Sequence, residues 1–457
     1  MDSVLTDYYR LPVDWETPPN QEVAVGNAGF FRFGSKVICY GSSASGVAPD
    51  SAHAKSFDAL KSVRFNGSEI HLPFNISQVI ENLRREHYVN QWGPRTSNIG
   101  SNPVIRKTYY FFRHFLPIPI RRHLQRSYFY GWKKLPFPNW PVDLSVDKLH
   151  QEYLRLLMNT KGLDRVPFIW FWPEGAPNAL ILTHDIETLS GRDSTAALMD
   201  LDASYGFKAS IQVVPEKRYE VPAQYVDEIR RRGFEFNVHD LNHDGNLYRD
   251  REEFLRRAAK INEYVLKYKA RGFRSGAMYR NLDWYDAFNF SYDMSAPNVA
   301  HLEPQRGGCC TVMPYYVGKI LEIPLTTTQD YSLFHILNDY SIDLWKEQVD
   351  LIRAGNGLIS FISHPDYLIE RRARATFEKL LVYLAELAER EKMWTPLAGD
   401  VDRWWRTRSQ MKLVQNGSGW EIVGSGKERA RLAYAYLDGD KLQYEVERVS
   451  AHEGVHS

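Results

Sequence analysis

The chain has 457 residues, of which 44% are hydrophobic and 25% are charged, and its formal net charge is +1. This composition is typical of an ordered globular protein, and the length predicts two or three domains. A net charge near zero gives no global reason for nucleic-acid binding, so we expect no nucleic-acid partner.

The N-terminal segment, MDSVLTDYYRLPVDWETPPN, carries acidic residues where a secretory signal carries positive charge, and it has no apolar core. No stretch of the chain is long and apolar enough to span a membrane. The three cysteines are an odd number that favours a reducing compartment over a disulfide scaffold. We therefore expect a cytoplasmic protein, and we interpret the adjacent Cys309 and Cys310 as ordinary buried thiols.

Residues 1–145 show short apolar runs divided by Gly, Ser and Pro, which predicts a β-rich or irregular region. Within it, residues 106–141 interleave aromatic and basic residues and contain no Asp or Glu. Such an arm can contact an anionic membrane, or a diphosphate carried by a lipid or nucleotide, which leaves a membrane-peripheral location open. The alternative is an arm wrapped around the protein, with its arginines paired to acids elsewhere. Its basic residues are Arg106, Lys107, Arg113, Arg121, Arg122, Arg126, Lys133 and Lys134.

Strand and helix signals alternate from residue 146 to residue 408. Apolar strands, among them NALILTHD, KASIQVVP, FEFNVHD and LISFISHP, are separated by segments with helical apolar spacing. The alternation predicts an α/β domain with a mostly parallel sheet, open or closed into a (β/α) barrel, whose active groups lie at the C-terminal strand ends. Residues 409–457 alternate with a period of two around glycine-rich turns, which predicts a small β appendage.

Two carboxylates follow the first of these strands, in the segment LILTHDIETL. Thr183, Asp185 and Glu187 are spaced two apart, so on an extended segment they share one face at the mouth of the barrel. Neighbouring carboxylates repel each other unless a cation or a proton lies between them. The pair therefore suits metal binding or acid–base catalysis, and the alternative is an exposed strand end.

Two histidines, His239 and His243, stand four residues apart directly after the strand FEFNVHD. If a helical turn begins there, both imidazoles lie on one face and can chelate a cation; otherwise they are structural. Two histidines and one carboxylate form a common ligand set for a catalytic Zn²⁺ or a similar ion. Asp185 or Glu187 would supply the carboxylate, and the other would be free to act as a base.

Three further segments place polar residues at strand ends. FRSGAMY carries Arg274, FSYDMSAPN carries Asp293 and Ser295, and LISFISHPDYL ends an apolar strand with His364. Taken alone, each of the first two segments is interpreted as a surface charge or a loop residue. His364 is a candidate acid or base, with a packed structural histidine as the alternative.

In chain order, the segments THDIE, HDLNH, FRSG, YDMS and ISH resemble the five motifs of the polysaccharide deacetylase family. This family is also called carbohydrate esterase family 4 or the NodB-homology domain, and the resemblance covers about residues 165–400. It implies a distorted (β/α) barrel and metal-dependent hydrolysis of an acyl amide or ester, usually the N-acetyl group of an amino sugar.

The resemblance also implies a role for each matching residue. Asp185 would be the catalytic base, and Arg274 would orient it. Glu187 would join His239 and His243 on a divalent metal, for which Zn²⁺ is preferred and Co²⁺, Ni²⁺ or Fe²⁺ are alternatives.

By the same resemblance, His364 would be the general acid that protonates the departing amine, and Asp293 would hold its imidazole in place. The chain departs from the more frequent form of the family in four of the five motifs, since FRSGAMY also lacks an expected Pro and YDMSAPN an expected Trp. Ile186 separates two acids that are commonly adjacent, and Asp240 stands where Ser or Thr is common.

We therefore expect a metal-dependent deacylase that acts on an acylated amino sugar. The substrate would be an intracellular glycan, a nucleotide sugar or a lipid-linked intermediate. One alternative is hydrolysis of a small non-sugar amide or cyclic imide on the same fold. Another is a catalytically silent protein that binds or assembles glycans.

Overall fold

The computed structural model describes residues 4–12, 20–21, 27–35, 37–52, 54, 56–91, 129, 131–417 and 419–447. Most of the basic and aromatic arm expected at 106–141 falls outside these ranges, at residues 106–128 and 130. Its proposed contact with a membrane or a diphosphate therefore stays a prediction. Within the described ranges, every helix is too short or too polar to cross a membrane.

An eight-stranded sheet forms the centre of the protein, in the order β12-β13-β11-β10-β9-β8-β7-β14. Neighbouring strands pair in parallel, except for the antiparallel pair at the β12 edge. The mostly parallel α/β sheet predicted from the sequence is therefore confirmed. The strands are β7 (Ala179–Ile186), β8 (Ala209–Val213), β9 (Glu235–His239), β10 (Gly272–Arg274), β11 (Tyr292–Asp293), β12 (Tyr315–Val317), β13 (Ile320–Glu322) and β14 (Leu358–Ser363).

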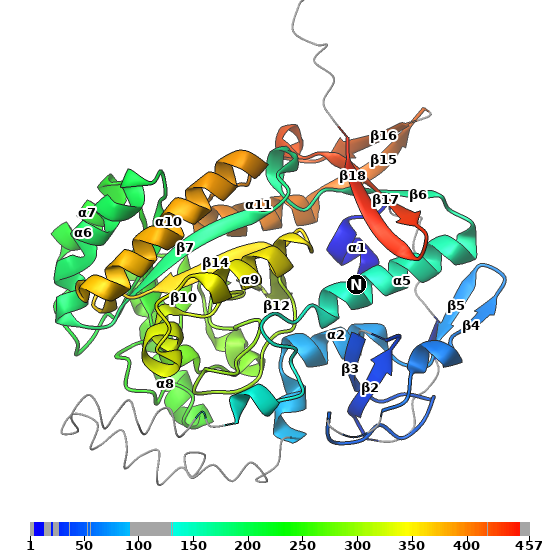
Figure 1. Cartoon of the computed structure of the whole chain (residues 1–457), viewed down its shortest axis with the longest axis horizontal. Helices are drawn as coiled ribbons and strands as arrows, with labels where there is room; N and C mark the ends of the chain where they lie inside the picture. Colours follow the sequence, from blue (N-terminus) through cyan, green and yellow to red (C-terminus); the bar gives the residue numbers. More distant parts are fainter. Residues whose placement is uncertain are drawn as a thin grey trace, which may run out of the picture.

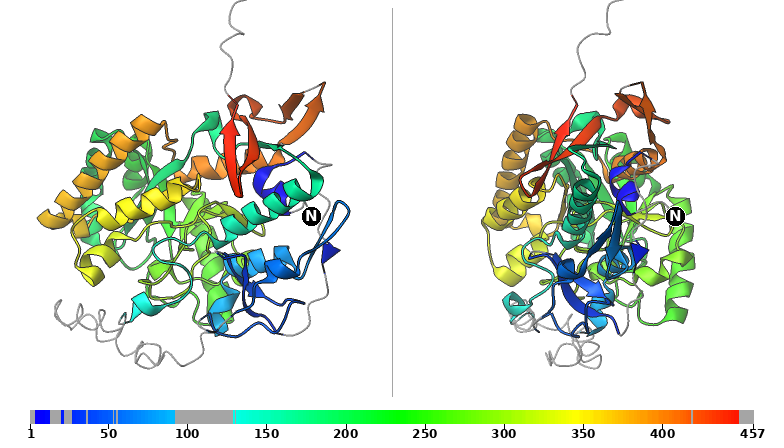
Figure 2. Two further views of the ribbon diagram at one scale, coloured as in Figure 1. Left: turned by 45° about the vertical axis from the view of Figure 1, so that its right-hand side comes forward. Right: turned by 90° about the vertical axis from the view of Figure 1, so that its right-hand side faces the viewer.

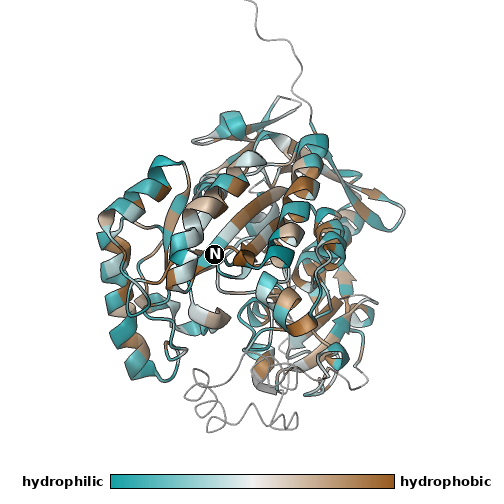
Figure 3. Cartoon of the chain, turned by 60° about the vertical axis from the view of Figure 1, so that its left-hand side comes forward, coloured by the Kyte–Doolittle hydropathy of each residue, from teal (hydrophilic) through white to brown (hydrophobic). Residues whose placement is uncertain are grey.

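Helices lie against the outside of this sheet (Figure 1). All eight residues of β7 are buried, as expected for a parallel strand covered on both faces. Figure 3 shows that the hydrophobic strands lie inside and that hydrophilic residues colour the outer faces of the helices. The helices are α6 (Leu189–Ser204), α7 (Ala223–Arg231), α8 (Arg251–Lys267), α9 (Asp343–Arg353), α10 (Arg371–Glu391) and α11 (Ala398–Gln410).

Helix α8 illustrates how local sequence sets these elements. Asp250 precedes the helix, and its side chain accepts a hydrogen bond from the backbone N–H of Glu253, which satisfies one of the free donors of the first turn. Phe254, Ile261 and Val265 are buried along one face at helical spacing. The sequence therefore specifies both where the helix begins and which side faces the sheet.

Side-chain hydrogen bonds, rather than a backbone ladder, join the segment after β13 to the edge strand β14. Thr326, on the segment after β13, donates a hydrogen bond of 2.9 Å to Leu358 O and accepts one of 2.9 Å from Ser360 N on β14. Thr327 donates to Ser360 O at 2.7 Å. The sheet thus curls into the distorted barrel that was expected.

The N-terminal and C-terminal elements lie together on one side of the protein, away from α6, α7 and α10 (Figures 1 and 2). Strand β17 pairs with both β18 and β6, so the C-terminal strands extend a sheet that begins at residue 165. The boundaries of the three predicted regions stay a prediction. The elements are α1 (Val4–Tyr9), β1 (Asn20–Gln21), β2 (Gly29–Phe33), β3 (Val37–Gly41), β4 (Arg64–Asn66), β5 (Glu69–Leu72), α2 (Ile76–Arg84), α5 (Ser145–Lys161), β6 (Arg165–Ile169), β15 (Lys412–Asn416), β16 (Gly419–Val423), β17 (Leu432–Asp438) and β18 (Lys441–Val446).

The three cysteines, Cys39, Cys309 and Cys310, are buried and free. Burial raises the pKa of the Cys309 thiol well above its usual range. The interpretation of Cys309 and Cys310 as ordinary buried thiols is confirmed.

Candidate active site

Strand β7 directs its side chains alternately to the two faces of the sheet. His184 points away from the candidate site, where its Nε2 lies 2.7 Å from Asp202 Oδ2 and its Nδ1 lies 2.8 Å from Ser363 Oγ. Because these partners use both ring nitrogens, His184 is a structural residue. Its neighbour Asp185 and the following Glu187 turn the other way, toward the C-terminal ends of the strands.

Glu187, His239 and His243 come together at this end of the sheet. Nε2 of His243 lies 2.8 Å from Oε1 of Glu187, and Nε2 of His239 lies 3.8 Å from the same oxygen. One ligand atom from each residue can be chosen so that all three lie within 4.8 Å of one another. The predicted convergence of two imidazoles and one carboxylate is therefore present in the structure.

The donor atoms of this cluster fit a divalent cation. His239 Nδ1 lies 3.0 Å from the carbonyl oxygen of Arg274, which places the ring proton on Nδ1 and leaves the lone pair of Nε2 directed at Glu187. Nε2 of His239 and Nε2 of His243 are buried, and neither makes a well-aligned hydrogen bond within the described ranges. Two buried imidazole lone pairs beside a carboxylate are the arrangement of a catalytic three-ligand site.

The loop that carries His243 is bent rather than helical. Asp240 and His243 both have a φ of +54°, a backbone conformation that is costly for residues other than glycine. Arg218 donates hydrogen bonds to the carbonyl oxygens of Asn242 and His243, and so holds the bend. The two histidines therefore meet through a strand end and a strained loop, and the helical turn considered from their spacing is not formed.

Asp185 is paired with a buried arginine. Nη1 of Arg274 donates to Asp185 Oδ1 at 2.7 Å and to Thr183 Oγ1 at 2.9 Å, while its Nε donates to the carbonyl oxygen of Met294 at 3.0 Å. Burial, the largest influence, raises the pKa of Asp185, but the nearby cations, Arg274 foremost, bring it below its ordinary value. Asp185 is thus held ionised, with Oδ2 3.7 Å from Nε2 of His239.

His364 ends β14 on the other side of Glu187, and its Nε2 lies 3.6 Å from Glu187 Oε1. Its Nδ1 lies 2.6 Å from Asp330 Oδ1, and its backbone N–H donates to Asp330 Oδ2 at 2.7 Å. Burial lowers the pKa of His364, but the Asp330 carboxylate outweighs it and raises the pKa well above the usual value. Asp330 is itself completely buried.

The expected pairing of Asp293 with His364 is wrong. The Asp293 carboxylate instead accepts hydrogen bonds from the Tyr285 hydroxyl at 2.7 Å, the Ser295 backbone N–H at 2.9 Å and the Ser295 hydroxyl at 2.8 Å. Asp293 lies on β11, in register with Glu322 of β13, while Asp330 is the carboxylate bonded to His364.

Asp330 was not anticipated from the sequence, although the sequence carries a signal for it. It ends the polar run TTTQD, which follows the apolar segment ILEIPL. Thr326 and Thr327 in this run fix the segment beside β14, which carries Asp330 to His364. A polar run at the end of a buried strand is the pattern that selected the other site residues.

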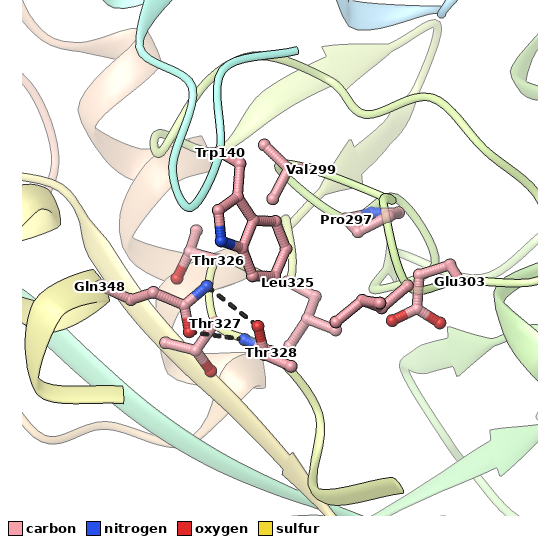
Figure 4. Close-up of a pocket in the computed structure, with 10 residues that line it drawn as sticks. Trp140, Pro297, Val299, Glu303, Leu325, Thr326, Thr327, Thr328 and Gln348 are labelled. Atoms are coloured by element: carbon pink, nitrogen blue, oxygen red, sulfur yellow. Dashed lines mark hydrogen bonds between the residues drawn. The ribbon is translucent and has the colours of Figure 1, made fainter. Parts of the chain in front are cut away.

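A small pocket lies beside the same segment (Figure 4). Trp140 and Glu303 line it together with Thr326, Thr327 and Thr328, and its volume is about 10 Å³. Burial raises the pKa of Glu303 to about 7, and Gln329 donates a hydrogen bond to its carboxylate. Because the space holds one water molecule at most, it is a detail of packing and not a substrate cavity.

Comparisons with known proteins give structural likenesses only. No family model matches the chain, and no curated protein matches it. A structure described as a polysaccharide deacetylase from Mycobacterium smegmatis is 16% identical, with a TM-score of 0.42, over 55% of this chain and 98% of the other. A peptidoglycan deacetylase from Bacillus subtilis is 13% identical, with a TM-score of 0.32, over 51% and 94%. A structure from Bordetella bronchiseptica, described as a polysaccharide deacetylase involved in O-antigen biosynthesis, is 19% identical, with a TM-score of 0.31, over 42% and 73%. These three structures align with between 42% and 55% of this chain.

Proposed function

We propose that the protein is a metal-dependent hydrolase that removes an acyl group, the N-acetyl group of an amino sugar being the expected substrate group. The observation that carries the proposal is the convergence of two buried imidazole nitrogens on Glu187. An ionised Asp185 and a His364 bonded to Asp330 flank this cluster on its two sides. The amino-sugar substrate rests on the order and spacing of the five sequence motifs.

Glu187, His239 and His243 would hold the ion. Their mixed nitrogen and oxygen donors suit Zn²⁺ and also fit Co²⁺, Ni²⁺ or Fe²⁺. When bound, such an ion supplies Lewis-acid polarisation of the acyl oxygen. The structure favours Glu187 over Asp185 as the carboxylate ligand, because Glu187 approaches both histidines while Asp185 is engaged by Arg274.

Asp185 would act as the general base. Arg274 occupies its Oδ1, so Oδ2 is the oxygen that can accept a proton from the attacking water. The buried guanidinium of Arg274 keeps the Asp185 carboxylate ionised and orients it through a charge-assisted hydrogen bond. The hydrogen bond from Arg274 to Thr183 holds the guanidinium itself in place.

His364 would act as the general acid. Asp330 binds Nδ1 and stabilises the imidazolium form, so the proton available for transfer is on Nε2, which faces the ligand cluster. Transfer of this proton to the departing nitrogen lets an amine leave in place of a far less stable amide anion.

The test is an acetate-release screen on N-acetylated sugars, sugar nucleotides and N-acetylglucosamine oligomers, run beside elemental analysis of the purified protein. We expect about one bound metal ion per chain, and acetate release that the Asp185→Asn variant loses. Ring opening of a cyclic imide by protein that releases no acetate from any sugar would move the assignment to small-amide hydrolysis. Protein without metal and without turnover would overturn the hydrolase proposal.

A further inference from the structure

A carboxylate from the N-terminal part of the chain reaches the loops around the site. Glu86 lies two residues after the end of α2 and is 6% exposed. Its carboxylate accepts hydrogen bonds from Arg280 Nε at 2.7 Å, from Arg280 Nη2 at 2.5 Å and from the backbone N–H of Gly308. One side chain thus joins two loops that follow it by about two hundred residues, one after β10 and one after β11.

The loop after β11 is shaped to admit this carboxylate. Gly307 and Gly308 have φ values of +127° and +142°, which are accessible to glycine and strained for other residues. A Cβ atom on Gly307 would lie only 2.7 Å from Glu86 Oε1. Tyr88 adds a second anchor, because its hydroxyl donates to the carbonyl oxygen of Gly308 at 2.6 Å. The N-terminal part therefore fits into this loop with close steric complementarity.

Arg280 carries the link on to the candidate metal site. Its Nη1 donates to the carbonyl oxygen of Met278 at 2.7 Å, next to Ala277, and both of these residues have a φ of +54°. The preceding Gly276 packs against the ligand loop, since a Cβ atom there would lie 3.0 Å from His243 Cδ2 and 2.5 Å from Asp240 Oδ2. The strained backbone of residues 276–278 thus forms a wall against His243, and Arg280 holds that wall.

We propose that Glu86 is a positioning residue for the metal site. Through Arg280 it keeps the 276–278 backbone against His243. The N-terminal part of the chain therefore helps to shape the metal site. The claim that the position of this loop affects metal affinity rests on the proposed function. The claim that Glu86 holds the loop in place does not. Glu86 bonds to Arg280 and to the Gly308 backbone, so it would act through them and is not a catalytic residue.

Two variants of the full-length protein test the proposal. Glu86→Gln removes the charge that pairs with Arg280, and the double variant Glu86→Gln/Arg280→Met removes both charges, so that no uncompensated cation stays buried. We expect both variants to speed hydrogen exchange of the amides in residues 275–280. We also expect both to weaken Co²⁺ binding by about 10-fold to 100-fold, as for the loss of a residue that orients metal ligands, with an altered Co²⁺ absorption spectrum.

Asp402→Asn is the matched control. Asp402 is completely buried and accepts hydrogen bonds of 2.7 Å from Arg271, Ser291 and Arg406. Arg271 and Ser291 precede β10 and β11, so this link lies at the opposite end of the same strands. We expect Asp402→Asn to lower the thermal midpoint while exchange at residues 275–280 and Co²⁺ affinity stay as in the wild type.

The outcomes separate this proposal from the proposed function. Unchanged exchange at residues 275–280 in both Glu86 variants overturns the holding of the loop. Faster exchange with wild-type Co²⁺ affinity and spectrum overturns the effect on the ligands. If the wild-type protein binds no Co²⁺, the metal-site proposal is overturned. The exchange measurement would still decide whether Glu86 holds the loop.

Discussion

Asp330 and His364 are joined by two hydrogen bonds, one to the imidazole Nδ1 at 2.6 Å and one from the histidine backbone N–H at 2.7 Å. The two contacts fix the position of the carboxylate as well as the orientation of the ring. Nε2 is thereby the only ring nitrogen of His364 directed toward Glu187. This geometry makes Asp330 the residue that sets the protonation state of the proposed general acid.

Replacing this carboxylate should impair proton transfer while metal binding is kept. We expect Asp330→Asn to lower kcat by about 10²-fold to 10⁴-fold, the usual contribution of a general acid. The bound metal, measured by elemental analysis, should stay at the wild-type level. Asp202→Asn is the control, because the Asp202 and His184 pair has the same kind of buried contact, at 2.7 Å, outside the site. An equal loss of kcat in both variants would show that the effect is structural.

Substitutions of a metal ligand and of the proposed general acid should differ in their effects on metal content and turnover. His239→Ala removes one of three ligands, so we expect it to lose both the bound metal and turnover. His364→Ala should keep the metal and lose only turnover, because His364 bonds to Asp330 and is not one of the three clustered ligands. Metal content by elemental analysis and acetate release are measured on the same preparations. Loss of metal in His364→Ala would place that residue among the ligands.

Much of the fold could be predicted because period and burial are local properties of the sequence. The fully buried β7 and the helical apolar spacing of α8 are legible in the sequence without knowledge of their partners. Closure of the barrel was harder to predict from the sequence pattern, because it depends on hydrogen bonds from Thr326 and Thr327 to the backbone of β14. Hydrogen bonds between side chains and a distant backbone leave no periodic pattern.

The candidate site divides in the same way. Glu187, His239 and His243 could be selected because each stands at the end of an apolar strand, and such ends converge in a parallel sheet. Asp330 was missed because the resemblance assigned the partner of His364 to Asp293, and the sequence alone does not reveal which carboxylate reaches that imidazole. Glu86 was missed because its contact with Arg280 joins separate parts of the chain.

Because Thr326 helps to close the barrel, its substitution should cause a measurable loss of stability. Thr326→Val keeps the shape of the side chain, but leaves the buried Ser360 N–H and Leu358 carbonyl without their partner. Because an unsatisfied buried polar group costs about 1–3 kcal/mol, we expect the free energy of unfolding to fall by about 2–4 kcal/mol. Urea unfolding measures the change. A loss below about 0.5 kcal/mol would show that the Thr326 hydroxyl adds little to closure, and that the remaining contacts, among them the hydrogen bond from Thr327 to Ser360 O, hold the segment against β14.

Glu322 makes stability depend on pH in a direction that can be predicted. The side chain is completely buried, and its register partner is Asp293, so burial first and then the neighbouring carboxylate raise its pKa well above the usual value. A carboxyl group whose pKa is raised by folding binds its proton more tightly in the folded state. Its contribution to stability is therefore complete below the unfolded pKa of about 4.3, and it is lost as the pH rises toward the folded pKa.

Glu322→Gln tests this sign, because the amide keeps the oxygen that accepts a hydrogen bond from Ala296 N and replaces the acidic proton with an N–H donor that cannot ionise. Wild-type stability, measured by urea unfolding between pH 5 and 8, should fall more steeply with rising pH than that of the variant. Over this range each unit of pH should account for up to about 1.4 kcal/mol of the difference. If the free energy of unfolding depends on pH equally in the two proteins, Glu322 is already ionised in the folded state. Another group would then offset the repulsion between the Glu322 and Asp293 carboxylates.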